Sequence, residues 1–187
     1  MTDRKGDTGI PAVLNERLSK IHVLTHAELA QLFGVIADLR DRAIFLLAYR
    51  HGIRASEIGL LERDDVDYKA NRITIHRLMR SPSNIHPLQK DEREALKRYL
   101  KSRDDNSGAL FLGPRGDAVT RRGLDWLMKG YGAQAKLPRE KRHFHALKHS
   151  IAVHLLSAGA DLRSVHKWLG HMLLQSTALY LYLAEER

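Results

Sequence analysis

The chain has 187 residues, of which 43% are hydrophobic and 28% are charged, as expected of one soluble globular domain. Its net charge of +9 favours a polyanionic partner, and the absence of cysteine excludes disulfides and thiolate metal sites. The sequence has neither a membrane-length apolar run nor the apolar core of a secretory signal, so we expect a cytoplasmic, nucleoid-associated protein.

The first 20 residues are expected to lie outside the folded domain. Residues 1–20 mix charges with glycine and proline, and we expect them to form a flexible leader. One folded domain is expected over residues 21–187. It opens with Thr25, which together with Glu28 forms a capping box that predicts the start of a helix.

The next segments predict a buried helix and a hairpin. Residues 42–49 are apolar on nearly all sides, which is typical of a buried helix, and Gly52 should end it. Arg54 should open a short helix that continues to Leu61. Residues 72–76 then alternate in the manner of a strand.

The second half of the chain predicts mainly helices. A turn at Pro82 and Asn84 should lead into a returning strand near residues 85–86. Helices are expected over 91–103, 120–135 and 145–157, between Asp161 and Gly170, and from about Ser176. The predicted fold class is therefore α+β, mostly helical with a small antiparallel sheet.

Two short motifs place cations on helices. Arg54 precedes Glu57 by three residues, so the carboxylate can hold the guanidinium in one orientation. In the pentad HALKH, His145, Lys148 and His149 share one helix face. A zinc site of the HExxH type is disfavoured there, because alanine follows the first histidine; His149 is expected to pack or to orient the backbone.

A third motif combines a histidine with a tyrosine. His171 follows Gly170, and a glycine just past a helix can swing the next side chain out of line. Tyr180 lies nine residues beyond His171. Tyr182 is about 200° away from Tyr180 on a helix, so the two cannot face one site, and the spacing selects Tyr180.

These motifs share a chemistry. A phosphodiester is a poor electrophile, and cleaving it without a metal needs cationic donors, a nucleophile and a proton source for the leaving oxygen. Arg54, Lys148, His145 and His171 could be the donors, and the Tyr180 hydroxyl is a competent nucleophile. No cofactor or metal is expected.

The ordered set resembles the tyrosine recombinases, also called the phage integrase family, from about Leu24 to Tyr182. The family motif G-[L/I]-R-x-S-E matches at Arg54. H-x-L-R-H matches at His145, with Lys148 at the arginine position, and L-G-H matches at His171, followed by the nucleophile at Tyr180. The resemblance implies the family's catalytic fold.

The family also places a lysine on a β-hairpin. Residues 73–88 resemble that hairpin, and the lysine position holds Met79. The flanks HRL and HPL most resemble the recombinases that invert fimbrial switches. Because two family cations are replaced, at Met79 and Lys148, reduced activity is expected. The basic residues expected to contact DNA are Arg77, Arg80, Lys141 and Arg142.

The resemblance implies a site-specific recombinase that integrates, excises or inverts duplex DNA through a 3′-phosphotyrosyl link on Tyr180. It also implies a tetramer on DNA. Two alternatives stay open: a catalytically weakened member that binds DNA as a regulator, and a relaxase of the type IB topoisomerase kind.

Overall fold

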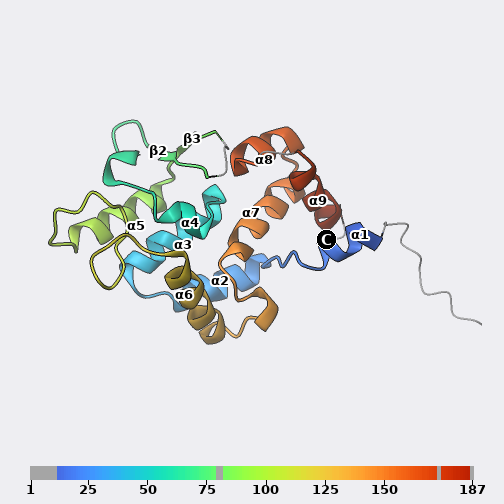
Figure 1. The fold of residues 1–187 in the computed structure, drawn as a ribbon, viewed down its shortest axis with the longest axis horizontal. Helices are drawn as coiled ribbons and strands as arrows, with labels where there is room; N and C mark the ends of the chain where they lie inside the picture. Colours follow the sequence, from blue (N-terminus) through green and yellow to red (C-terminus); the bar gives the residue numbers. More distant parts are fainter. Residues whose placement is uncertain (1–11, 79–81, 172–173, 186–187) are drawn as a thin grey trace, which may run out of the picture.

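The computed structural model describes residues 12–78, 82–171 and 174–185 (Figure 1). They form a mostly helical α+β fold with one small antiparallel sheet, which confirms the predicted class. None of the described helices has the length and apolar character needed to cross a bilayer. The helices are α1 (Ala12–Leu18), α2 (His26–Val35), α3 (Leu39–His51), α4 (Ala55–Ile58), α5 (Lys90–Lys101), α6 (Arg121–Gln134), α7 (His145–Ser157), α8 (Leu162–Leu169) and α9 (Leu174–Glu185), with 3-10 turns η1 (Arg63–Asp65) and η2 (Arg139–Lys141).

Polar caps begin several helices where the sequence predicts them. Thr25 accepts a hydrogen bond from the backbone N–H of Glu28, whose carboxylate accepts from the N–H of Thr25, completing the capping box of α2. At the starts of α6 and α8, the side chains of Thr120 and Asp161 accept from the backbone N–H groups of Gly123 and Ser164, without the reciprocal bond. These side chains occupy donors that a helix N-terminus leaves unpaired.

Two glycines end α3 and α8 in the left-handed conformation, as predicted. Gly52 has φ 55° and Gly170 has φ 60°. Both positions are also crowded: a Cβ on Gly52 would lie 2.5 Å from Cδ2 of Leu169, and one on Gly170 would lie 2.7 Å from Nε of Arg77. These two turns therefore bring the ends of α3 and α8 against each other.

Three strands form the sheet in the order β1–β2–β3, all antiparallel: β1 (Val66–Asp67), β2 (Arg72–Ile75) and β3 (Asn84–Pro87). The hairpin of β2 and β3 was predicted, and Ile73 pairs with His86 in its centre. The two-residue strand β1 was not predicted, because so short a segment carries too little alternation to be recognised.

Two elements differ from expectation. Within the expected leader 1–20, the described part contains helix α1. Glu16 of this helix forms an ion pair with Lys20 at 2.6 Å. Helix α4 ends at Ile58 instead of Leu61, and the chain turns at Gly59.

The buried side chains form two clusters. The larger one lies among α2 to α6 and the sheet, and includes Phe45 and Leu147. The smaller one lies among α7, α8 and α9, and includes Ile151, Leu169 and Tyr180. Helix α7 contributes to both and packs on α3, α8 and α9 (Figure 1).

Candidate active site

Arg54 lies at the N-terminus of α4, beside a cavity. Its Nη1 donates to Oε1 of Glu57 at 2.7 Å, and its backbone N–H donates to Oε2 of Glu57 at 2.9 Å. The carboxylate orients the guanidinium, as predicted. The cavity holds about 210 Å³ and is also lined by Ser56, Arg121, Asp125 and His145. An anion in this cavity would meet two arginines and one carboxylate, that of Asp125, which lies 3.8 Å from Nε of Arg121.

Arg77, expected at the DNA, lies inside the protein. Its side chain is 0% exposed, and it donates to Oε2 of Glu57 at 3.0 Å. Further donors reach the carbonyl oxygens of His51, Gly52 and Trp168. In this structure its guanidinium faces buried acceptors in place of the surface, a partner set that the sequence alone does not reveal.

Lys148, expected as a donor to phosphate, is also buried, with 1% of its surface exposed. Its Nζ donates to the carbonyl oxygens of Gly52 at 2.9 Å and Leu169 at 2.6 Å. Burial lowers the pKa of Lys148 well below its ordinary value, and the charge of Arg77 lowers it further. In this structure the Lys148 side chain links the C-terminal ends of α3 and α8 through these two bonds and does not reach the surface.

Positive charge exceeds negative charge around Glu57. Burial raises the pKa of Glu57, but the hydrogen bond from Arg54 and the charges of Arg77 and Lys148 outweigh it, so its pKa is lowered. Glu57 is therefore a carboxylate. Two arginines, Arg54 and Arg77, are paired with this one anion, and the excess positive charge suits a phosphate in the cavity beside Arg54.

Helix α7 carries two histidines toward this region. His145 lines the cavity and meets His149 edge-on, with ring centroids 4.5 Å apart. Burial lowers the pKa of His145 to about 4, and the charges of Lys148 and Arg54 add to this. His145 is therefore a neutral imidazole at pH 7, in place of the cation that the sequence suggested.

His171 lies beside Tyr180. The two rings are stacked, with centroids 6.0 Å apart at 26°. Nδ1 of His171 is 2.8 Å from the hydroxyl of Thr177, which also lies 3.2 Å from Nδ1 of His166. Burial lowers the pKa of His171 to about 3, with a further contribution from Lys148.

Tyr180 is 4% exposed, whereas Tyr182 on the other side of α9 is 43% exposed. This confirms that the two tyrosines face opposite ways. The Tyr180 hydroxyl is 2.8 Å from Nδ1 of His149. Burial raises the pKa of Tyr180 well above its ordinary value, while the charge of Arg54 acts to lower it.

The remaining basic residues that were expected at the DNA have other partners or fall outside the description. Nζ of Lys141 bonds to both carboxylate oxygens of Glu28 at 2.8 Å. Nε of Arg142 donates to the carbonyl oxygen of Leu137 at 2.7 Å. Met79 and Arg80 lie outside the described residues.

Sequence reasoning missed three contributors. Arg121 lines the Arg54 cavity, Thr177 binds His171, and His149 binds Tyr180. The Thr120 cap, which places Arg121 at the first turn of α6, was a usable signal. The partners of Thr177 and His149 depend on how α9 packs, which no local pattern reveals.

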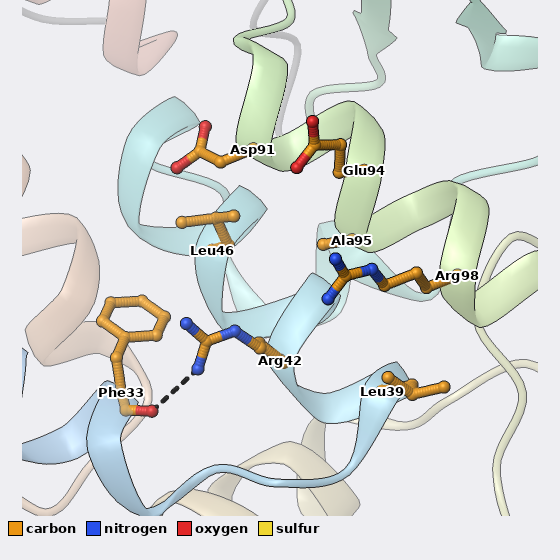
Figure 2. A pocket seen from close by; sticks show the side chains of 8 residues that line it. All are labelled: Phe33, Leu39, Arg42, Leu46, Asp91, Glu94, Ala95 and Arg98. Carbon is orange, nitrogen blue, oxygen red and sulfur yellow. Dashed lines mark hydrogen bonds between the residues drawn. The ribbon is translucent and has the colours of Figure 1, made fainter.

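A second hollow, of about 360 Å³, lies between α2, α3 and α5 (Figure 2). Phe33, Leu46 and Ala95 give it apolar walls, and Arg42 and Asp91 bring charges of both signs. None of the residues expected to do chemistry lines it. Within the described part of the chain, no cluster of three or more histidine and carboxylate ligands could hold a metal ion.

Comparison with known proteins was made by sequence and by structure. A model of the phage integrase family matches residues 22–187. The chain is 34% identical over 172 residues to the type 1 fimbriae regulatory protein FimE of Escherichia coli, covering 87% of this chain and 86% of FimE. It is 34% identical over 168 residues to the tyrosine recombinase XerA of Thermococcus kodakarensis, where it spans 58% of the relative.

Solved structures agree on the fold. A crystal structure of XerA recombinase superposes with a TM-score of 0.79 at 24% identity, over 88% of this chain and 61% of that one. XerH site-specific recombinase bound to palindromic difH substrate, in a post-cleavage complex, gives a TM-score of 0.80 at 23% identity, over 99% of this chain and 56% of that one.

Proposed function

The chain belongs to the phage integrase family, and on this premise we propose that it is a site-specific recombinase that cuts and rejoins duplex DNA through Tyr180. The observation that carries the proposal is the convergence of three distant motifs. The Tyr180 ring stacks on His171, its hydroxyl reaches His149 of the HALKH pentad, and His145 of that pentad lines the cavity of Arg54.

The proposed reaction is a transesterification. The Tyr180 oxygen attacks phosphorus, a 3′-phosphotyrosyl bond forms, and the DNA strand leaves as a free 5′ hydroxyl. The energy of the phosphodiester is retained in the covalent link, so no nucleotide or metal is required for rejoining. A second 5′ hydroxyl then attacks the link and releases Tyr180.

Arg54 is proposed to hold the scissile phosphate. Its guanidinium faces the cavity and is oriented by Glu57, so it can present donors to two phosphate oxygens. Arg77 is proposed to act from inside the protein as a fixed positive charge that favours the more anionic transition state, and Lys148 as a buried donor whose protonated form that transition state stabilises. His145 and His171 are proposed to donate hydrogen bonds at the same site.

The proposed partner is duplex DNA, and its path is proposed to continue from the cavity onto α6. A third hollow, of about 440 Å³, shares Arg121 and Asp125 with the Arg54 cavity. The other residues that line it are Arg122, Trp126 and Lys129. Trp126 is 70% exposed, and cations around an exposed aromatic ring suit a nucleic-acid strand.

Self-association on DNA and a place in the nucleoid belong to the same proposal. XerH, one of the structural relatives, was captured on a palindromic site, and a palindrome suits symmetric protein copies. We propose that four copies assemble on two DNA sites, and light scattering of the protein–DNA complex measures this directly.

A second candidate is a DNA-binding regulator with weak or no cleavage. Two observations favour it. The Lys148 side chain is bonded to backbone carbonyl oxygens and does not reach the surface, and Tyr180 is nearly inaccessible. FimE is named as a regulatory protein. Binding without covalent capture would identify this function.

The deciding experiment is covalent capture. Nicked duplexes drawn from the DNA that flanks the gene are incubated with the protein, and adducts that survive denaturation are counted. Recombination predicts adducts at one sequence and rejoined product after a 5′ hydroxyl strand is added. Adducts without sequence preference would indicate a topoisomerase, and specific binding without adducts would indicate the regulator.

A further inference from the structure

The Tyr180 hydroxyl is hydrogen-bonded to a histidine that the motif comparison leaves without a role. Nδ1 of His149 lies 2.8 Å from Oη of Tyr180, and the ring centroids are 5.7 Å apart. His149 is the last residue of the HALKH pentad and lies one turn along α7 from His145. A nucleophile and an imidazole at this distance are the usual arrangement for proton abstraction.

His171 and Glu57, two other groups of the candidate site that could accept a proton, are engaged elsewhere. His171 presents its ring face to Tyr180 and uses Nδ1 for Thr177. Both carboxylate oxygens of Glu57 are bonded to arginines. Among the imidazoles of the described site, His149 is the one whose nitrogen lies at hydrogen-bond distance from the Tyr180 hydroxyl.

We propose that His149 is the general base of strand transfer, with Nδ1 taking the phenolic proton as Tyr180 attacks phosphorus. This inference rests on the proposed function and adds a catalytic residue to it. The O–H bond of Tyr180 breaks, the oxygen bonds to phosphorus, and the bond from phosphorus to the 5′ oxygen breaks. That oxygen takes a proton from water. When a 5′ hydroxyl reverses the link, the Tyr180 oxygen regains its proton from His149.

The ionisation of the pair defines what bound DNA must supply. Burial lowers the pKa of His149 to about 2, with contributions from His145 and His143, so the ring is neutral and its Nδ1 can accept, but it is a weak base in the free protein. Burial raises the pKa of Tyr180, so the proton stays on oxygen in the absence of DNA. A phosphodiester brings negative charge that stabilises the imidazolium, and the transfer accompanies attack without a free phenolate.

The test compares His149→Asn with a matched control on the same helix. An asparagine side-chain oxygen keeps an acceptor near the position of Nδ1 but cannot take a proton. His154, also on α7, has its Nδ1 3.0 Å from the Tyr49 hydroxyl, so His154→Asn makes the same change in a second tyrosine–histidine pair. Single-turnover adduct formation on the nicked duplex is measured at saturating protein, together with the melting temperature.

The expected result is a loss of roughly 10²-fold or more for His149→Asn, the usual contribution of a general base. His154→Asn should cleave at the parent rate. A His149→Asn protein that is folded, binds DNA and cleaves at the parent rate would overturn the inference while leaving the proposed function in place. Loss of adduct in Tyr180→Phe checks that function separately. Faster cleavage by His149→Phe would also overturn the inference, since His149 would then be a restraint on Tyr180.

A pH profile separates a base from a structural residue. Without His149, the phenol must lose its proton to solvent, so the rate of His149→Asn should rise about tenfold per pH unit between pH 7 and pH 9. The parent, whose base is neutral throughout, should vary much less. The titratable groups that face His149 are His145 and Lys148 on α7, His143 before it, His22 before α2, and Tyr180 on α9. A parallel pH profile for both proteins would contradict the role.

A measurement without DNA tests the pair directly. In the ¹⁵N NMR spectrum, Nδ1 of His149 should be unprotonated and should respond to Tyr180→Phe, with the proton on Nε2. A proton on Nδ1 would reverse the hydrogen bond and overturn the inference, whatever DNA the protein recognises.

Discussion

Lys148 and Arg77 donate to the same carbonyl oxygen, that of Gly52, at 2.9 Å and 3.0 Å. The two side chains come from α7 and from the residues after β2, and they meet where α3 ends. Each also reaches the last turn of α8, Lys148 at Leu169 and Arg77 at Trp168. The cations thus hold three elements together while charging the site.

Replacing Lys148 should affect stability as well as cleavage. In Lys148→Met, the carbonyl oxygen of Leu169 loses this donor, and a buried acceptor left unpaired costs about 1–3 kcal/mol of unfolding free energy. Lys148→Arg keeps a cation and serves as the comparison. Urea unfolding measures the first effect and adduct formation the second. If Lys148→Met were as stable as the parent, the bond to Leu169 would not hold α8 in solution.

Tyr180→Phe should abolish covalent adducts with little change in DNA affinity, because one oxygen is removed from a side chain that is nearly inaccessible. Tyr182→Phe is the control and should keep the adduct, since Tyr182 is exposed on the opposite face of α9. Denaturing gels of protein on labelled duplex give the result. An adduct that persists in Tyr180→Phe and is lost in Tyr182→Phe would reverse the assignment.

Arg54→Ala should slow cleavage by about 10²–10³-fold, the scale of removing one donor to a developing oxyanion. DNA affinity should fall much less, because other basic residues contact the backbone. Arg98→Ala is a suitable control, since Arg98 lines the hollow of Figure 2. Single-turnover cleavage rates of the two variants test this prediction. Equal rates for Arg54→Ala and Arg98→Ala would show that Arg54 does not hold the scissile phosphate.

Lysine and arginine side chains on α6 should contribute to DNA affinity through phosphates. Arg122→Ala should reduce the slope of log affinity against log salt concentration by about 1, the effect of one lost phosphate contact. Lys101→Ala, an exposed change on α5, should leave the slope unchanged. Titrations at several salt concentrations measure both, and identical slopes would place α6 away from the DNA.

Stability should fall in acid, beginning below pH 6.5. Burial lowers the pKa of His86 and of His171 to about 3, and of His145 to about 4, from an ordinary 6.5. Below pH 6.5 the unfolded chain therefore binds more protons than the folded chain, so the unfolding free energy decreases as pH falls toward these values.

Urea unfolding at pH 7, 6 and 5 checks this prediction. His86→Phe keeps a ring against Trp168, on which His86 stacks at 3.9 Å, and removes one titrating group. Its unfolding free energy should depend less steeply on pH than that of the parent. Constant stability from pH 7 to pH 5 would contradict the burial of neutral histidines.

Local signals in the sequence were sufficient for most element boundaries and for part of the site. Gly52, Gly170 and Asp161 mark helix ends through their own backbone and side-chain preferences, and the Arg54–Glu57 contact follows from helical spacing. Tyr180 was selected over Tyr182 because a helix turns them apart.

The inward direction of Arg77 and Lys148 could not be predicted. Their acceptors are backbone carbonyls at Gly52, Trp168 and Leu169, which come close only after α3, α7 and α8 have packed. A basic residue beside a catalytic motif therefore looks the same in sequence whether it faces DNA or the interior.

The two buried clusters separate the proposed nucleophile from the proposed phosphate site. Tyr180 belongs to the smaller cluster, while the Ala55 that follows Arg54 belongs to the larger one. Because the two clusters are separate, an opening of the smaller one can leave the larger one, with the Arg54 cavity beside it, in place. Segments of a protein can open independently in this way, with amide hydrogen exchange reporting each one. Under the proposed function, binding of the phosphate and presentation of Tyr180 would then be two separate steps, so recognition of a DNA site would be distinct from cutting it.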